Sequence, residues 1–396
     1  MASSARPSRP GLPGGVAFGV YALHLWAIGG IAASNILMAV SALVAIGERR
    51  WRPLASPALV LPLRLLAWFA FAFVLSIAFS YEPMTSARRL DDLLNLLPLL
   101  LTFVYVEEEA QARLVAGGMV AVGALLAVYG LGQMWVGTGG LDLGHRIPGP
   151  FSHYQTFAGV LLLCDVLGLA LLTTARGRRR LWLVLALLLI NVALFANLTR
   201  GVWVALVLSL LFLVAWRAPR YLLAAVPALV VVAFVVPGPV RDRASTIFDL
   251  QNESNYDRLC MVYAGAHMVV ERPLFGLGPE LVEERYPLYR HPTAPRDRRP
   301  HLHNSYLQIA AESGLVSLVL FLGLLGGSLF AAVRGYRREG GPAGPRADLY
   351  LGAAAALVAY TFAALFEDNW TDTEVQRVAL FIVALPFCLD RLREDS

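Results

Sequence analysis

The sequence predicts an all-α integral membrane protein with about twelve transmembrane helices. Hydrophobic residues make up 57% of its 396 positions and charged residues only 15%. The mean hydropathy is +0.60, and apolar windows of helical length recur along the chain. A soluble domain of this length needs far more polar surface. Soluble one-domain and two-domain folds are therefore excluded, and the bilayer is the solvent.

Each window that crosses ~30 Å of hydrocarbon needs about 20 residues. The predicted spans are residues 15–31, 33–47, 58–80, 90–106, 112–135, 153–174, 181–198, 201–216, 221–237, 305–333, 348–366 and 374–390. The first two are short, and the break at residues 33–35 could be a kink. The chain then divides into a disordered cytoplasmic tail (1–14), transmembrane helices 1–9 (15–237), a large periplasmic loop with short helices (238–304), transmembrane helices 10–12 (305–390) and a second cytoplasmic tail (391–396).

The distribution of arginine predicts the orientation. The net charge is +5 and every basic residue is Arg. With the N-terminus inside, the short cytoplasmic segments carry 18 Arg, and the short outer segments carry four, at Arg88, Arg89, Arg146 and Arg200. This bias follows the positive-inside rule, so both termini are expected in the cytoplasm and no nucleic-acid partner is expected. The first apolar run lacks a cleavage site and is interpreted as a span, not a signal peptide.

The segment between the ninth and tenth spans breaks the pattern of short loops. It carries nine Arg, nine acidic residues and four His. Residues 255–271 place Leu259, Val262, Tyr263, His267 and Val270 at helical spacing, which predicts an amphipathic helix that ends before a Pro-Gly turn. Loops of this length inside a compact protein are usually functional. We expect this loop to face the periplasm and to cap a cavity between the helices.

The strongest local signal is the sequence PHLHNSYLQ at residues 300–308, where an apolar helix begins. A helix N-terminus offers free N–H groups and partial positive charge to an anion. A histidine at this point, His303 or its neighbour His301, can take a proton from a hydroxyl near neutral pH. Equally, Asn304 or Ser305 could simply cap the helix, with both histidines solvated.

Arginines on the outer side give the second signal. Arg200 lies in the short turn NLTRGVW at residues 197–203, between two apolar spans, with no acid beside it in the sequence. A guanidinium at this depth needs an anionic partner, and it binds phosphate oxygens bidentately; the alternative is snorkelling to the interface. Arg258 in the loop helix could serve the same anion or be solvated. Arg88 and Arg89 could line the same face, or pair with Asp91 and Asp92.

Several kinds of chemistry lack a motif. The cysteines Cys164, Cys260 and Cys388 have no metal-ligand spacing, and neither a disulfide framework nor a zinc site is supported. There is no phosphate-binding Gly-Lys loop, no HExxH and no GxSxG. Glu367, Asp368 and Asp372 form one acidic cluster, which is thin support for a cation. No metal and no cofactor are expected, and phosphate contact should depend on Arg.

Three stretches resemble the O-antigen ligase family, whose core domain is shared with O-antigen polymerases and some protein O-oligosaccharyltransferases. They are GPFSHYQTFAG at residues 149–159, TRGVW at 199–203, and the segment from Arg258 through PLFGLG at 273–278 to HNSYL at 303–307. Order and spacing agree over residues 60–390. One departure is Tyr263, where the family usually has Trp, and this weakens the alignment around Arg258.

The resemblance implies a GT-C-like membrane glycosyltransferase that works in the periplasm of a bacterial inner membrane without a metal or a nucleotide sugar. The donor would be a glycan on undecaprenyl pyrophosphate, and the acceptor a lipid A-core oligosaccharide, in lipopolysaccharide biosynthesis. Arg200 and Arg258 would hold the donor diphosphate, and His303 would activate or orient the acceptor hydroxyl. We expect further substrate contacts at Arg88, Arg89, His301, Asn304 and Tyr306.

Other functions stay open at this stage. Within the family, an O-antigen or exopolysaccharide polymerase differs from a ligase mainly in its acceptor, and a protein O-oligosaccharyltransferase is a third reading. A polysaccharide transporter would also have about twelve spans, but it usually shows internal repeats and charges near the midplane. Here Arg64 and Arg377, inside spans, are interpreted as lying close enough to span ends to snorkel.

Overall fold

The computed structural model describes residues 14–140, 146–224, 238–247 and 249–394, and these residues form helices and turns but no strand. The α-helices are α1 (Gly14–Trp26), α2 (Ile31–Gly47), α3 (Val60–Ala78), α4 (Pro83–Ser86), α5 (Leu97–Tyr105), α6 (Glu109–Thr138), α7 (Tyr154–Leu172), α8 (Gly177–Ala196), α9 (Arg200–Arg217), α11 (Gly238–Ser245), α12 (Glu253–Glu271), α13 (Val282–Tyr289), α14 (Ser305–Arg338), α15 (Ala347–Ala363) and α16 (Thr373–Glu394). The 3-10 helices are η1 (Ala27–Gly29), η2 (Arg52–Ala55), η3 (Pro57–Leu59), η4 (Ala87–Leu96), η5 (Pro219–Tyr221) and η6 (Gly341–Ala343).

Six of the described helical segments are long and apolar enough to cross a membrane. They are Pro57–Ala78, Glu109–Thr138, Tyr154–Leu172, Gly177–Ala196, Arg200–Arg217 and Ser305–Arg338. Each coincides with a predicted span, and three shorter apolar helices, Gly15–Gly29, Ile31–Gly47 and Ala347–Ala363, coincide with three more. The all-helical class is confirmed for the described residues, and its apolar helices are consistent with a membrane protein. Twelve spans remain a prediction.

Two predicted spans differ from the structure or fall outside it. The segment predicted as one span at 90–106 is divided into η4 and the short helix α5, which has nine residues. At ~1.5 Å per residue, α5 alone is too short to cross the hydrocarbon. Charged side chains at 88–92 are exposed or half-buried and keep η4 at the surface of the bundle. Most of the predicted span at 221–237, and the predicted tail at 1–14 up to residue 13, lie outside the described residues.

Arg377 corrects another expectation, because it does not snorkel. It lies on α16, its side chain is fully buried, and its guanidinium donates to Ser34 Oγ and Asn35 Oδ1 at the start of α2. A buried charge is tolerated when polar groups surround it. The polar break at residues 33–35 therefore supplies the partners of a buried arginine.

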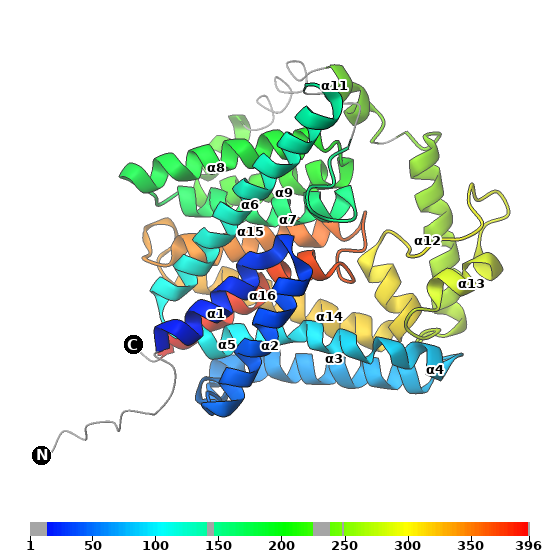
Figure 1. Cartoon of the computed structure of the whole chain (residues 1–396), viewed down its shortest axis with the longest axis horizontal. Helices are drawn as coiled ribbons and strands as arrows, with labels where there is room; N and C mark the ends of the chain where they lie inside the picture. Colours follow the sequence, from blue (N-terminus) through cyan, green and yellow to red (C-terminus); the bar gives the residue numbers. More distant parts are fainter. Residues whose placement is uncertain (1–13, 141–145, 225–237, 248, 395–396) are drawn as a thin grey trace, which may run out of the picture.

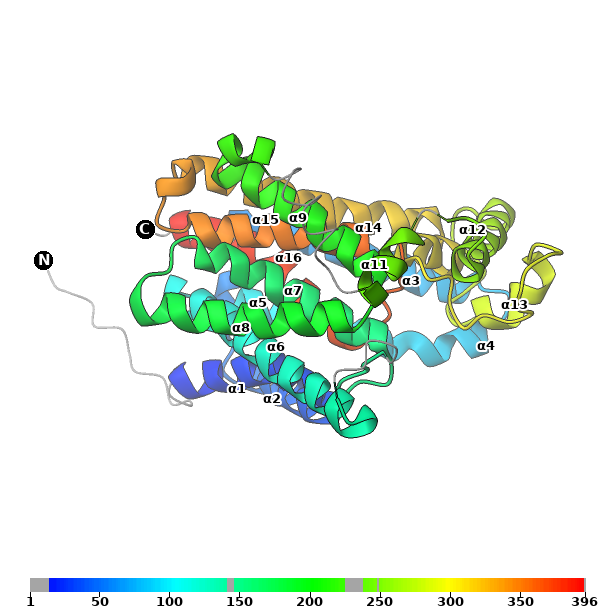
Figure 2. The ribbon, with the colours of Figure 1, turned by 90° about the horizontal axis from the view of Figure 1, so that it is seen from above.

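The centre of the bundle is formed by α7, α15 and α16, with the other long helices around them (Figure 1 and Figure 2). Most of α7 is buried inside the protein. Residues 353–356 of α15 are all Ala and buried, and a Cβ on Gly352 would lie 3.0 Å from the Ala170 Cβ of α7. Small residues let helix backbones approach closely. This tight centre fixes the ends of α7, α15 and α16 relative to one another.

The two ends of the bundle differ. The start of α1 and the end of α16 lie at one end, whereas α4, α12 and α13 lie at the opposite end, with α12 running across it (Figure 1 and Figure 2). The loop helix predicted at residues 255–271 is confirmed as α12, which begins two residues earlier, at Glu253. The helices of the long polar loop, α12 and α13, thus lie at the end of the bundle opposite the start of α1 and the end of α16.

A break in α14 positions its first segment. Gly314 has φ +81°, and a Cβ there would lie 2.0 Å from the carbonyl oxygen of Leu274. The carbonyls of Ala311 and Glu312 accept hydrogen bonds of 2.8 and 3.0 Å from the N–H groups of Leu277 and Gly278. The PLFGLG turn therefore takes the carbonyls that the break frees, and residues 305–313 stand as a separate short segment of helix.

Candidate active site

One pocket at this end is lined by four arginines, and we call it the arginine pocket. Its polar wall comes from the start of α7, the start of α9, α11, α12 and the loop after α15. The side chains that define it are Arg146, Tyr154, Gln155, Arg200, Arg243, Arg258, Glu367 and Asn369. The structure thus brings together Arg200 and Arg258, which are 58 positions apart in the sequence.

Arg200 is held by uncharged partners. It is the first residue of α9 and is 6% exposed. Its guanidinium donates to the Thr246 carbonyl at 2.7 Å, to Thr246 Oγ1 at 2.8 Å and to Asn255 Oδ1 at 2.8 Å. The Asn255 amide donates back to the carbonyls of Thr246 and Asp249 at 2.8 and 2.7 Å. This network orients the guanidinium but leaves its charge unneutralised.

The other three arginines also lack an acidic partner within 4 Å in the part of the chain that the structure describes. Burial lowers the pKa of Arg258, and burial together with Arg146 lowers the pKa of Arg243. Asp257, next to Arg258, pairs with Arg299 instead. Like charges held this close are costly until an anion binds between them.

Hydrogen bonds bring the motifs of the sequence to this pocket. Asn197 Nδ2 donates to the carbonyls of Ile147 and Tyr154 at 2.8 and 3.0 Å, which ties the turn before α9 to the start of α7. Thr199 Oγ1 donates to Asn197 Oδ1. A Cβ on Gly201 would lie 2.7 Å from the Cβ of Phe366, so the glycine lets the start of α9 approach the loop that carries Glu367.

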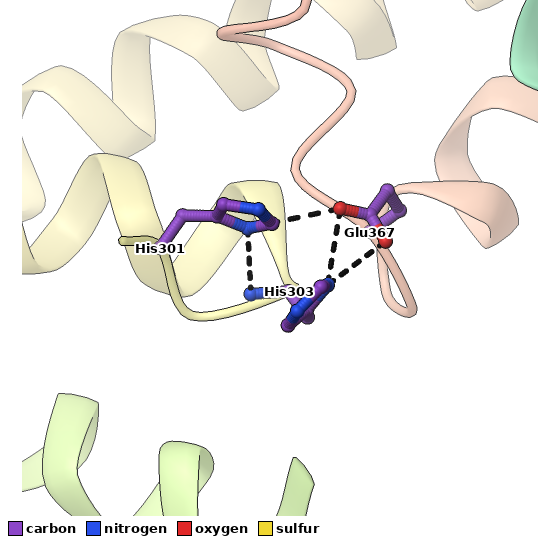
Figure 3. Close-up of side chains that lie close together, drawn as sticks. All are labelled: His301, His303 and Glu367. Carbon is purple, nitrogen blue, oxygen red and sulfur yellow. Dashed lines mark hydrogen bonds and ion pairs between the residues drawn. The ribbon is translucent and has the colours of Figure 1, made fainter. Parts of the chain in front are cut away.

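His303 and His301 both point at Glu367, which follows α15 (Figure 3). Nδ1 of His303 lies 2.9 and 3.1 Å from the two carboxylate oxygens, and Nδ1 of His301 lies 3.7 Å from Oε1. The backbone of His303 has φ +47°, an unusual conformation for a residue with a side chain. Ser305 secures the arrangement, since its N–H bonds the Ala364 carbonyl and its hydroxyl the Glu367 carbonyl, at 2.9 and 3.1 Å.

The protonation states suit base chemistry. Burial, reinforced by Arg258, lowers the pKa of His303 to about 4, and burial also lowers the pKa of His301. Burial raises the pKa of Glu367 to about 7. Both imidazoles are therefore neutral at neutral pH. When Nδ1–H of His303 donates to Glu367, Nε2 carries a free lone pair that can accept a proton.

The remaining expected contacts lie in different places. Asn304 caps α14, because Oδ1 accepts the Leu307 N–H at 2.9 Å, and Tyr306 donates to the Thr361 carbonyl at 2.8 Å. Arg88 is exposed on η4, whereas Arg89 pairs with Asp92 at 3.2 Å. Among the residues expected to bind substrate, only His301 stands beside the His303–Glu367 pair.

The same three side chains could hold a cation. His301, His303 and Glu367 each offer a ligand atom within 4.8 Å of the others. Two imidazoles and a carboxylate are suitable ligands for zinc or iron. However, the positive charges of Arg258 and Arg299 act on His303, and like charge opposes a cation. The site therefore fits a neutral base beside an anion-binding pocket better than a metal centre.

Sequence reasoning missed several members of this site. It did not assign a role to Glu367, Arg243, Tyr154 or Gln155, and it counted Arg146 only as an outer-loop charge. No local sequence pattern marks these residues as part of a site, because helix starts and loops commonly carry polar and charged side chains. His303 and Glu367 are 64 positions apart, and only the packing of α15 against its neighbours brings them together.

The comparison with protein families indicates which family part of the chain resembles. Residues 183–322 match the family model described as O-antigen ligase, over about a third of the chain. Residues 183–322 of the chain are therefore similar to the O-antigen ligase family. The matched segment contains Arg200, Arg258 and His303, which lie on α9, on α12 and just before α14. A comparison with curated proteins gave no match.

The match to the O-antigen ligase model supports the resemblance drawn from the motifs. Two stretches, residues 199–203 and the segment 258–307, lie inside the matched range, while the stretch at 149–159 lies before it. Glu367 and Arg146 also lie outside that range. The O-antigen ligase model therefore covers the residues that the sequence assigned to catalysis, and the structure adds partners from outside it.

Proposed function

We propose that the chain is an O-antigen ligase, which transfers a glycan from undecaprenyl pyrophosphate to a lipid A-core oligosaccharide on the periplasmic face of a bacterial inner membrane. The observation that carries the proposal is the arginine pocket with the His303–Glu367 pair beside it. Four guanidiniums without acidic partners favour a polyphosphate ligand. A neutral histidine held by a carboxylate favours activation of a hydroxyl.

The reaction is an inverting displacement at the anomeric carbon. The acceptor oxygen forms a bond to this carbon while the bond from the carbon to the diphosphate oxygen breaks, and the electron pair stays on the diphosphate. His303 Nε2 takes the hydroxyl proton. Arg200 and Arg258, supported by Arg146 and Arg243, stabilise the charge that grows on the leaving diphosphate. Glu367 stabilises the imidazolium that forms.

No metal enters this scheme. Arginines take the role that Mg²⁺ has in many diphosphate-dependent enzymes, since both neutralise phosphate charge. The His301–His303–Glu367 group would be a base and its carboxylate partner, with His301 completing the wall. The end of the bundle that carries α12 and α13 would face the periplasm, and the termini would lie in the cytoplasm, as the arginine distribution predicts.

The test uses purified protein in nanodiscs with undecaprenyl-pyrophosphate glycan, with or without lipid A core, and products resolved on a gel. Transfer that requires the core establishes a ligase. A ladder of longer lipid-linked glycans without the core establishes the polymerase of the same family. No consumption of the donor with either acceptor contradicts the proposal and revives a transporter.

A further inference from the structure

A second pocket lies beside the first segment of α14, and we call it the carboxylate pocket. Its polar and aromatic wall is defined by Asp92, Asn95, Gln308, Glu312, Trp370 and Gln376. These residues come from η4, α14, α16 and the loop between α15 and α16. The carboxylate pocket shares no lining residue with the arginine pocket.

Both segments that carry the catalytic pair continue into this pocket. Gln308 Oε1 accepts the N–H of Leu302, the residue before His303, at 2.9 Å. Trp370 follows Glu367 by three residues, and its N–H donates to Ser305 Oγ at 3.3 Å. Asp368 exerts its charge on both Glu312 and His303. The His303–Glu367 pair therefore lies where the two pockets approach one another.

The chemistry of the carboxylate pocket differs from that of a phosphate site. Asp92 pairs with Arg89, and Glu312 Oε1 accepts the backbone N–H of Glu280 at 3.1 Å. Amide groups donate to and accept from hydroxyls, and carboxylates accept from them.

Trp370, whose ring packs against Phe69 and Phe321, adds an apolar surface to the wall. A hydroxyl-rich ring suits this wall, whereas a diphosphate would find only one arginine, Arg89, which is already paired with Asp92.

One buried side chain lacks a partner in this wall. Gln376 is 5% exposed and lines the pocket, and its amide makes no hydrogen bond to any residue that the structure describes. A polar ligand at this point would therefore supply the amide of Gln376 with hydrogen-bond partners. Gln155 has the same character in the arginine pocket, where it is 4% exposed and has no described side-chain partner.

We infer that the carboxylate pocket binds the acceptor sugar, whose ring stacks on Trp370 and whose hydroxyls bond Gln308, Glu312 and Gln376, so that the attacking hydroxyl is presented to His303. This assignment rests on the proposed transferase function and adds the place of its second substrate. The two substrates then approach the His303–Glu367 pair from pockets that are lined by different chemical groups.

The two glutamines provide a matched test in the full-length protein in nanodiscs. Gln376→Leu should raise KM for the acceptor about tenfold, the effect of losing a good hydrogen bond, and leave KM for the donor unchanged. Gln155→Leu should do the reverse. Arg298→Ala, at an exposed position outside both pockets, should leave both KM values unchanged.

Glu312→Gln gives a second test should Gln376→Leu fold poorly, since it keeps the shape of the side chain and replaces the acid with an amide. It should also raise KM for the acceptor and leave KM for the donor unchanged. A rise in donor KM, or no change in acceptor KM, for both variants overturns the assignment of this pocket. Absence of donor turnover in the unmodified protein would instead overturn the transferase function itself.

Discussion

The arginine pocket and the carboxylate pocket stand on either side of one histidine–glutamate pair, and they are lined by different chemical groups. The first has Arg146, Arg200, Arg243 and Arg258 against a single acid, Glu367. The second has Asp92 and Glu312 against a single base, Arg89. Both proposed substrates are lipid-linked glycans. The difference between the pockets suggests how the enzyme would distinguish its two substrates, because only the donor carries a diphosphate at its reacting carbon and only one pocket is lined by several arginines.

Removing an arginine should break the comparison most completely. Arg200→Ala or Arg258→Ala should lower kcat/KM for the donor by about 10²–10³-fold, the cost of losing a preorganised donor to the growing charge. Initial rates at several donor concentrations measure this. Arg298→Ala, on an exposed position of the same loop, is the control and should retain its activity. Near-normal rates in both pocket variants would sink their assigned role.

Removal of the proposed base should have the second-largest effect on the rate. His303→Ala should lower kcat by about 10²–10⁴-fold, since positioned general bases contribute this much, while the affinity for the donor stays the same. His301→Ala keeps the His303–Glu367 contact and should lose much less. Single-turnover rates with pre-bound donor separate the two variants. If His301→Ala has the larger effect, the base is His301.

The acid should set the pH dependence. The pKa of Glu367 is raised to about 7, so the carboxylate loses its charge as the pH falls through this value. An uncharged Glu367 cannot stabilise the His303 imidazolium, and the rate should therefore fall on the acid side of pH 7. Glu367→Gln should remove this limb of the profile and lower the rate. If the rate of the Glu367→Gln variant still falls at acid pH as in the unmodified protein, the group that titrates is not Glu367.

Chelation should have the smallest effect. If the three side chains His301, His303 and Glu367 act without a cation, extended treatment with a chelator should leave the rate unchanged, and the metal content of the purified protein should not correlate with activity. Added zinc should inhibit, because it would occupy Nε2 or Nδ1 of His303. Loss of activity on chelation that zinc restores would make the cluster a metal centre.

Periodicity and hydropathy were enough to predict most of the architecture. The long apolar helices, the loop helix α12 and the capped start of α14 each depend on local sequence, and each lies within a few residues of its expected position. The 3-10 segment η4 was not predicted. Mean hydropathy over a window of about 20 residues combines the charged residues of η4 with the apolar residues of α5 and hides the boundary between them. The partners of Arg377 were not predicted either, since they lie on α2.

The site was predicted in part for the same reason. Arg200, Arg258 and His303 stand at span ends or in the loop, where their chemistry is conspicuous in the sequence. The roles of Glu367, Arg243 and Gln376 could not be predicted, because the residues that surround each of them come from other segments of the chain. Hydrogen bonds between distant segments, such as Asn197 to Ile147, bring these residues together, and no local pattern encodes them.

Titration of sugar-free undecaprenyl diphosphate into the purified protein in nanodiscs tests most directly whether the arginine pocket is an anion site. The unmodified protein should bind the diphosphate more tightly than the monophosphate, and the affinity should fall at high salt. Arg200→Ala and Arg258→Ala should each weaken binding of the diphosphate by at least tenfold, whereas Gln376→Leu should not change it. Equal affinity of the arginine variants and the unmodified protein would contradict the account.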